Sequence, residues 1–124
     1  YIGIPIGELA SRSTFEETVF FLWNGRLPTK GELADFESSL RSRYAIPAGV
    51  EQLLTSIPKT AEPMHAVRTL VSALGLHDPK PNAIDAGSLR DKGLSILAQV
   101  PTLLAAFHRY RQGKPAVKPD ASLG

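Results

Sequence analysis

The chain has 124 residues, of which 43% are hydrophobic and 21% charged, a balance typical of one modest globular domain and not of a disordered chain. Fourteen basic and twelve acidic side chains leave a formal charge of +2, a surplus too small to indicate a nucleic-acid-binding surface. The absence of cysteine excludes disulfides, thiolate zinc sites and a cysteine nucleophile. No apolar run reaches the ~20 residues that cross a bilayer, and no signal-peptide pattern opens the chain. We therefore expect a soluble, cytoplasmic protein with neither a membrane nor a nucleic-acid partner.

Capping signals and the helical spacing of apolar residues predict an all-α, multi-helical fold. In a capping box, a hydroxyl and an acid three residues later satisfy the free backbone N–H groups of the first turn, and the segments 13–16, 14–17 and 29–32 all fit this pattern. No segment alternates for long enough to build a sheet. The predicted helices span residues 14–24, 29–43, 48–57, 63–76 and 88–112, with room for a short additional turn over 7–12.

Glycine and proline punctuate these helices. Gly25 and Gly113 are suited to the left-handed residue that ends a helix. Pro79 and Pro81 prevent the fourth predicted helix from continuing into the fifth, because each lacks a backbone donor and pushes the preceding residue out of the α region. Pro101 lies inside the last predicted helix, where it should introduce a kink.

Several features suggest that the chain is cut from a longer protein. It opens on Tyr1 and closes on a polar segment broken by prolines. The consecutive residues Phe20–Trp23 point to nearly every side of their predicted helix, and such a helix needs cover all round. Four or five short helices can supply only part of that cover.

The sequence carries little that points to chemistry. There is no G-x-G-x-x-G and no phosphate-binding loop, and His65, His77 and His108 share no metal-ligand spacing. The basic last turn around Arg109 and Arg111 is typical of any solvated helix C-terminus. We expect no catalytic, cofactor-binding or metal-binding residue in this chain.

Three blocks of residues, taken in order and spacing over nearly the whole chain, closely resemble the N-terminal part of the large helical domain of citrate synthase. The blocks are Gly3–Ile6, Leu9–Ala10, Ser13–Glu17, Gly25, Leu27–Thr29, Glu32–Leu33 and Phe36; then Pro63–Met64, Arg68–Thr69 and Ser72–Gly75; then Ala98, Pro101, Ala105–Ala106, Arg109 and Gly113. The family usually has arginine in place of Ile2, histidine in place of Glu62 and aspartate in place of His65. These departures leave open whether the relative is citrate synthase, 2-methylcitrate synthase or a divergent paralogue.

The resemblance implies a two-domain, mostly helical homodimer, an acyltransferase of the tricarboxylic acid cycle. Such an enzyme condenses acetyl-CoA with oxaloacetate and water to give citrate and CoA, and it needs no metal. In the family, an aspartate base and two histidines perform the reaction, in motifs further towards the C-terminus. None of the three histidines here matches those motifs. The resemblance therefore implies that residues 1–124 correspond to about the first third of the enzyme, without its small domain and its catalytic motifs. We expect the segment alone to be inactive.

The predicted helix over 63–76 is a candidate subunit interface. It carries two adjacent apolar stripes and only a narrow polar edge. A helix with two apolar stripes is stable only when other protein packs against both of them. The resemblance agrees, since the corresponding helix of the family packs against its symmetry mate. The candidate interface residues are Met64, Val67, Leu70, Val71, Ala73 and Leu74. The alternative is a central helix that is buried within one subunit.

Three functions remain open. The chain is a segment of a citrate synthase, a segment of a 2-methylcitrate synthase that uses propionyl-CoA, or a helical dimerisation module that shares the scaffold and performs no chemistry. The pocket residues that separate the two enzymes lie outside this sequence.

Overall fold

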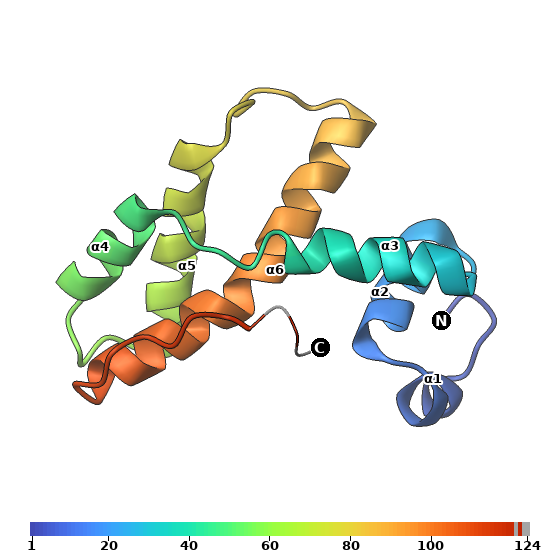
Figure 1. The fold of residues 1–124 in the computed structure, drawn as a ribbon, viewed down its shortest axis with the longest axis horizontal. Coiled ribbons are helices and arrows are strands. Elements are labelled where there is room, and N and C mark those ends of the chain that lie inside the picture. Colours follow the sequence, from blue (N-terminus) through green and yellow to red (C-terminus); the bar gives the residue numbers. More distant parts are fainter. Residues whose placement is uncertain (121, 123–124) are drawn as a thin grey trace. The chain divides into compact units, whose positions relative to one another are not determined.

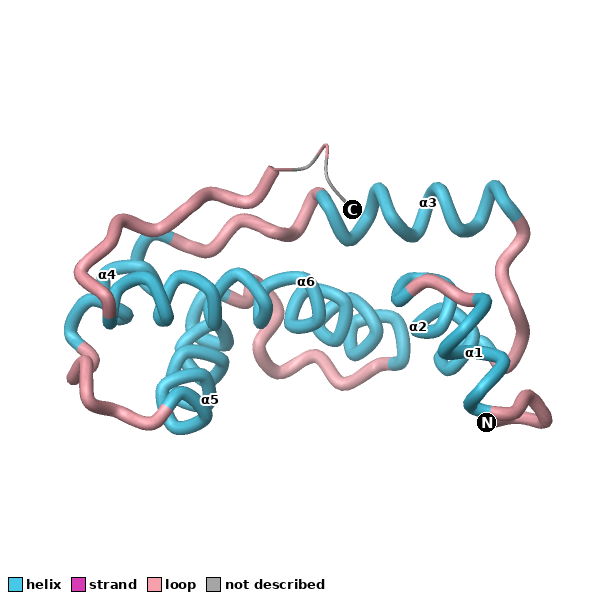
Figure 2. Tube along the Cα trace, turned by 90° about the horizontal axis from the view of Figure 1, so that it is seen from below, coloured by secondary structure: helices cyan, strands magenta, loops and turns pink. Residues whose placement is uncertain are grey.

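The computed structural model describes residues 1–120 and 122, and within them the regular structure is entirely helical (Figures 1 and 2). The expected all-α class is confirmed. The chain divides into two compact units, residues 1–39 and 40–124. The helices are α1 (Ile6–Arg12), α2 (Phe15–Asn24), α3 (Lys30–Arg41), α4 (Ala48–Ser56), α5 (Pro63–Leu74), the 3₁₀ helix η1 (Gly75–His77) and α6 (Ala86–Arg111).

In the first unit, the predicted caps set the helix boundaries. Of the two overlapping boxes before α2, the later one forms: the Thr14 hydroxyl accepts from the Glu17 N–H at 3.2 Å, and the Glu17 carboxylate accepts from the Thr14 N–H at 2.8 Å. The same exchange joins Thr29 and Glu32 at the start of α3. Gly25 ends α2 with φ of 70°, a left-handed conformation that costs glycine little.

Aromatic side chains form the centre of the first unit. The rings of Phe20 and Trp23 meet that of Phe36 edge to face, with centroids 5.9 and 6.2 Å apart. Phe21 on the same helix is buried, whereas Leu22 is 45% exposed. The expectation that this short set of helices covers α2 only in part is confirmed within the described residues.

The second unit has a continuous apolar core. Helix α5 contacts both α4 and α6, and four side chains that these helices contribute are almost fully buried: Val50, Leu70, Leu103 and Phe107. Around them pack Leu54, Ala66, Ala73, Leu74 and Ala106. Hydrogen bonds between distant segments brace the core, among them one from the Tyr110 hydroxyl to the Thr55 carbonyl at 2.7 Å.

The structure differs from the sequence expectations mainly at helix ends. Helix α3 ends at Arg41, and α5 ends at Leu74, where the chain tightens into η1. Helix α6 begins at Ala86, two residues early, because the Asp85 carboxylate accepts from the Ser88 N–H at 2.9 Å and caps the helix. Pro101 lies within α6, whose axis changes direction along its length (Figure 1).

Candidate functional site

The six predicted interface residues of α5 fall into two groups in this structure. Leu70, Ala73 and Leu74 are 0%, 9% and 9% exposed and belong to the core of their own unit. Val67 and Val71 are half-buried, and Met64 is 71% exposed. The core of the chain itself therefore covers half of the predicted set, and Met64 is the member with the most free surface.

An apolar groove of about 490 Å³ lies where the start of α5 meets the second half of α6. Pro63, Pro101 and Leu104 contribute to its walls, together with Ala105, Phe107, His108 and Arg111. Leu104 is 43% exposed, and Met64 directly follows Pro63 in the chain. Apolar side chains therefore reach the surface at this groove and at the exposed start of α5.

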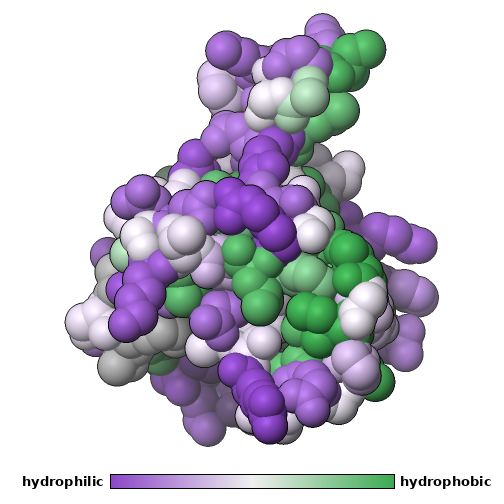
Figure 3. All heavy atoms as spheres, turned by 90° about the vertical axis from the view of Figure 1, so that its right-hand side faces the viewer, coloured by the Kyte–Doolittle hydropathy of each residue, from purple (hydrophilic) through white to green (hydrophobic). Residues whose placement is uncertain are grey.

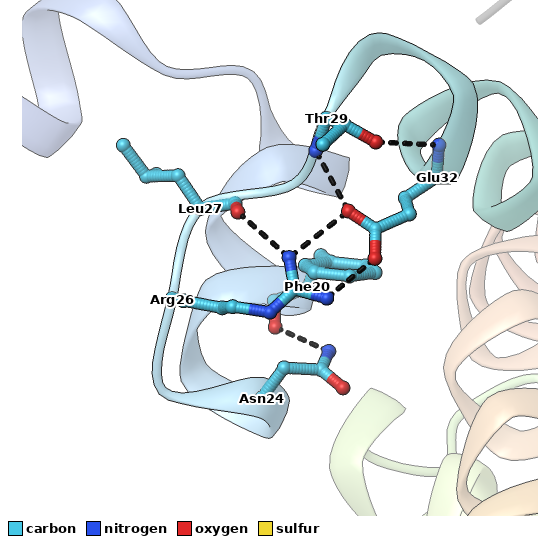
Figure 4. A network of polar contacts seen from close by, with 6 residues as sticks. All are labelled: Phe20, Asn24, Arg26, Leu27, Thr29 and Glu32. Carbon is cyan, nitrogen blue, oxygen red and sulfur yellow. Dashed lines mark hydrogen bonds and ion pairs between the residues drawn. The ribbon is translucent and has the colours of Figure 1, made fainter.

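A polar network joins α2 to the start of α3 (Figure 4). The Arg26 guanidinium donates to both carboxylate oxygens of Glu32, one at 2.9 Å and the other at a very short distance, and it also donates to the Leu27 carbonyl. These Arg26 bonds, followed by the donors of Thr29, lower the pKa of Glu32 to about 2. The pKa of Arg26 is raised by the same carboxylate. The guanidinium lies 5.6 Å from the Phe20 ring centroid, so the network braces the aromatic centre of the first unit.

The loop between η1 and α6 closes around one lysine. The Lys92 ammonium donates to the carbonyls of Pro81 at 3.0 Å and Ala83 at 2.8 Å and lies 3.3 Å from the Asp78 carboxylate. The backbone N–H of Lys80 donates to that carboxylate at 2.7 Å. Desolvation opposes these contacts, but the Lys80 donor, followed by Lys92, still lowers the pKa of Asp78.

The three histidines have different neighbours. The His65 ring is 3.7 Å from the Glu62 carboxylate, and both side chains are mostly exposed. His77 lies over the first turn of α4, so close that a Cβ at Gly49 would be 3.1 Å from its ring. His108 exchanges a hydrogen bond with Gln112 at 3.0 Å.

Neither a metal-ligating cluster nor a membrane-spanning helix is found in the described residues. In the part of the chain that the structure describes, no three His, Cys, Asp or Glu side chains are placed to hold a metal ion. The described helices also include none long and apolar enough to span a membrane. The His65 and Glu62 side chains are 66% and 73% exposed, so solvent screens the interaction between them. The polar contacts of the chain hold helices and loops in place.

Sequence reasoning missed the two polar networks. The Arg26–Glu32 pair spans six residues across a turn, and Lys92 is fourteen residues from Asp78. Neither spacing belongs to a helical or hairpin pattern. The only local signal was Asp78 before Pro79 and Lys80, since an aspartate there commonly accepts from the N–H two residues on.

Comparisons with known proteins match the whole chain. The family described as "Citrate synthase, C-terminal domain" matches residues 1–124. The chain is 38% identical over 124 residues to 2-methylcitrate synthase 1 of Corynebacterium glutamicum, covering 100% of this chain and 32% of that protein. It is 41% identical over 123 residues to citrate synthase of Deinococcus radiodurans, covering 99% and 33%. The crystal structure of citrate synthase from Thermotoga maritima superposes with a TM-score of 0.86 at 35% identity, covering 100% of this chain and 31% of that one. The chain thus spans about a third of the length of each of these relatives.

Proposed function

Because this chain belongs to the citrate synthase family, we propose that it is part of an acyltransferase that condenses a short-chain acyl-CoA with oxaloacetate. The observation that carries the proposal is the match over all 124 residues, at 35–41% identity, to relatives of both names. In this proposal the parent enzyme acts in the cytoplasm, and the condensation of acetyl-CoA is its contribution to the tricarboxylic acid cycle.

The acyl donor is the open part of the reaction. Relatives named citrate synthase and relatives named 2-methylcitrate synthase match the chain about equally well, at 41% and 38% identity. Acetyl-CoA and propionyl-CoA differ by one methylene, and discrimination of one methylene rests on the walls of the acyl pocket. We take acetyl-CoA as the first candidate and propionyl-CoA as the second.

Within the parent enzyme, this segment serves as scaffold. We place residues 1–124 in the N-terminal part of the large helical domain and the catalytic groups in the remaining two thirds of the protein. The separate neighbours of His65, His77 and His108, which are Glu62, Gly49 and Gln112, support this assignment. Abstraction of a proton from the acyl group needs a positioned base and donors for the developing oxyanion at a common point.

Release of free thiol from CoA tests the proposal. The full-length protein is mixed with oxaloacetate and either acetyl-CoA or propionyl-CoA, and kcat/KM is compared for the two donors. We expect the full-length protein to turn over at least one donor, and the ratio of the two kcat/KM values decides between citrate synthase and 2-methylcitrate synthase. Purified residues 1–124 should show no turnover under the same conditions. A full-length protein that turns over neither donor would favour a dimerisation module without chemistry.

We also propose that the parent is a homodimer in which α5 lies at the subunit contact. The exposed Met64, the half-buried Val67 and Val71 and the adjoining groove offer apolar surface that a second copy can cover. Leu70, Ala73 and Leu74 support this surface from beneath, within the core of the subunit.

Met64→Glu tests the assembly, because a charge at an exposed position leaves the fold of the subunit intact while opposing its own copy across a two-fold axis. We expect the full-length variant to sediment as a folded monomer, with unchanged circular dichroism. Leu76→Glu is the matched control, since Leu76 is 86% exposed and lies two residues beyond the end of α5, in η1. If the Met64→Glu protein stays dimeric, Met64 does not lie in the subunit contact.

A further inference from the structure

The Lys92 ammonium is surrounded by oxygen atoms that come almost entirely from one loop. Two are backbone carbonyls, of Pro81 and Ala83, and the third belongs to the Asp78 carboxylate. An ammonium has three N–H donors, so these three oxygens use all of them. The Lys92 and Asp78 side chains are 24% and 20% exposed, less than the 57% and 35% of the Arg26–Glu32 pair.

Hydrogen bonds at the end of η1 and within the loop hold these oxygens in place. The Asp78 carboxylate is fixed by the Lys80 N–H at 2.7 Å, and the Ala83 N–H donates back to the Lys80 carbonyl at 3.1 Å. Pro79 and Pro81 restrict the backbone at two of the intervening positions. The carbonyls therefore point to the ammonium from a backbone that is itself closed by hydrogen bonds.

The neighbouring charges do not compete for the site. Asp91, next to Lys92 in the chain, is engaged by the Arg43 guanidinium at 2.6 Å. The loop thus presents one carboxylate and two carbonyl dipoles to one positive charge. Three oxygen atoms around one point match the three N–H donors of an ammonium group, and they replace part of the hydration shell of a potassium ion.

We propose that the loop over residues 78–83 is a binding site for a small monovalent cation and that the chain fills this site with its own Lys92 ammonium. The class of ligand is ammonium, a primary alkylammonium or potassium. The site fixes the loop that joins η1 to α6, and the same loop forms one wall of a cavity of about 320 Å³, whose other walls include Val71, His77 and Gln99. Loss of the ammonium should loosen that wall, and a free cation of matching size should restore it.

Hydrogen–deuterium exchange of the full-length protein tests the proposal by following the peptide that contains residues 78–85. Lys92→Ala vacates the site, and we expect exchange in this peptide to become about tenfold faster, the size that loss of a charged hydrogen bond gives. Ammonium chloride or potassium chloride should slow exchange again in Lys92→Ala. Tetramethylammonium chloride at the same ionic strength should not, because that cation has no N–H and is too large for the loop.

Two further variants act as controls. Lys92→Met keeps the apolar stem but blocks the space, so its loop should exchange fast in all three salts. Lys114→Ala removes an exposed lysine from the C-terminal segment and should leave the 78–85 peptide unchanged. Exchange that stays at the wild-type rate in Lys92→Ala, or that responds equally to all three salts, would overturn the proposal.

If Lys92→Ala does not fold, a double-mutant cycle provides a second test. Lys92→Met and Asp78→Asn are compared with their double variant, again by exchange of the 78–85 peptide. Because both side chains act in one site, the acceleration in the double variant should be smaller than the product of the two single effects. Independent, multiplicative effects would overturn the proposal as well.

Discussion

The two units of this chain are stabilised in different ways. Residues 40–124 bury four large side chains almost completely, in a core to which α4, α5 and α6 all contribute. Residues 1–39 have a smaller apolar centre, built on the edge-to-face contacts of Phe36, and they depend on helix caps and on the Arg26–Glu32 network. Apolar burial stabilises in proportion to its area, while exposed polar contacts contribute little each. The second unit should therefore be the more stable of the two.

Both units leave large apolar side chains at the surface, and in the second unit Met64, Leu76 and Ile84 are each more than half exposed. The first unit leaves Tyr1, Ile2, Ile6 and Phe15 each more than half exposed. Figure 3 shows apolar side chains gathered into patches on the face it draws. Patches of this kind usually mark surfaces that pack against further protein. The comparison teaches that a helical segment can complete its caps locally while leaving its apolar faces for other parts of the protein to cover.

The largest expected effect is in the core of the second unit. Phe107→Ala should destabilise this unit by about 3–5 kcal/mol, because it empties a fully buried site between packed helices. Urea unfolding of residues 1–124, followed by circular dichroism at 222 nm, measures the loss. Leu76→Ala, at an 86% exposed position, should change stability by less than about 0.5 kcal/mol. Equal losses in the two variants would mean that this core is not what holds the unit together.

A similar substitution in the first unit should have a smaller and separable effect. Phe36→Ala removes the ring that Phe20 and Trp23 contact and should cost about 3 kcal/mol. Trp23 is the single tryptophan of the chain, so its fluorescence reports on this unit alone. We expect the fluorescence transition to move to lower urea while the main helical transition stays in place. Transitions that move together would show that the two units unfold as one.

The helix cap of α2 should contribute less still. Thr14→Ala removes the hydroxyl that accepts from Glu17 and should destabilise the first unit by about 1 kcal/mol. Ser13→Ala is the matched control, because Ser13 occupies the alternative cap position that the helix does not use. The fluorescence midpoint of Trp23 compares the two variants. A larger loss in Ser13→Ala would place the cap one residue earlier.

The smallest expected effect is a pH dependence of the first unit. The folded pKa of Glu32, about 2, lies below its unfolded value, so the unfolded chain binds the proton first as the pH falls. The contribution of Glu32 is therefore complete above its ordinary pKa near 4.5 and is lost between there and pH 2. The Trp23 fluorescence midpoint should fall over this window in the wild type and less steeply in Glu32→Gln. High salt should reduce the difference, since both partners are partly exposed.

The sequence by itself determined the class of fold and most helix starts. The reason is local: a cap such as Thr14–Glu17 joins residues three apart, and the left-handed conformation that ends α2 costs Gly25 little. The ends of α3 and α5 were less predictable, because apolar spacing continues past the point where the backbone tightens or turns. The start of α6 was missed by two residues, although its cap, Asp85, also acts locally.

Only the tertiary structure decided which apolar side chains of a helix are buried in the core and which are exposed to solvent. The two stripes of α5 are alike in sequence, yet Leu70 is fully buried in the core while Met64 is left in solvent, because α4 and α6 cover one side of the helix and not the other. The same holds for Lys92, whose partners lie nine to fourteen residues away along a proline-rich loop. Local signals specify where a helix begins, because the groups involved are neighbours in the chain. Burial and long-range polar contacts depend on which distant segments the fold brings together, and no short pattern in the sequence records that.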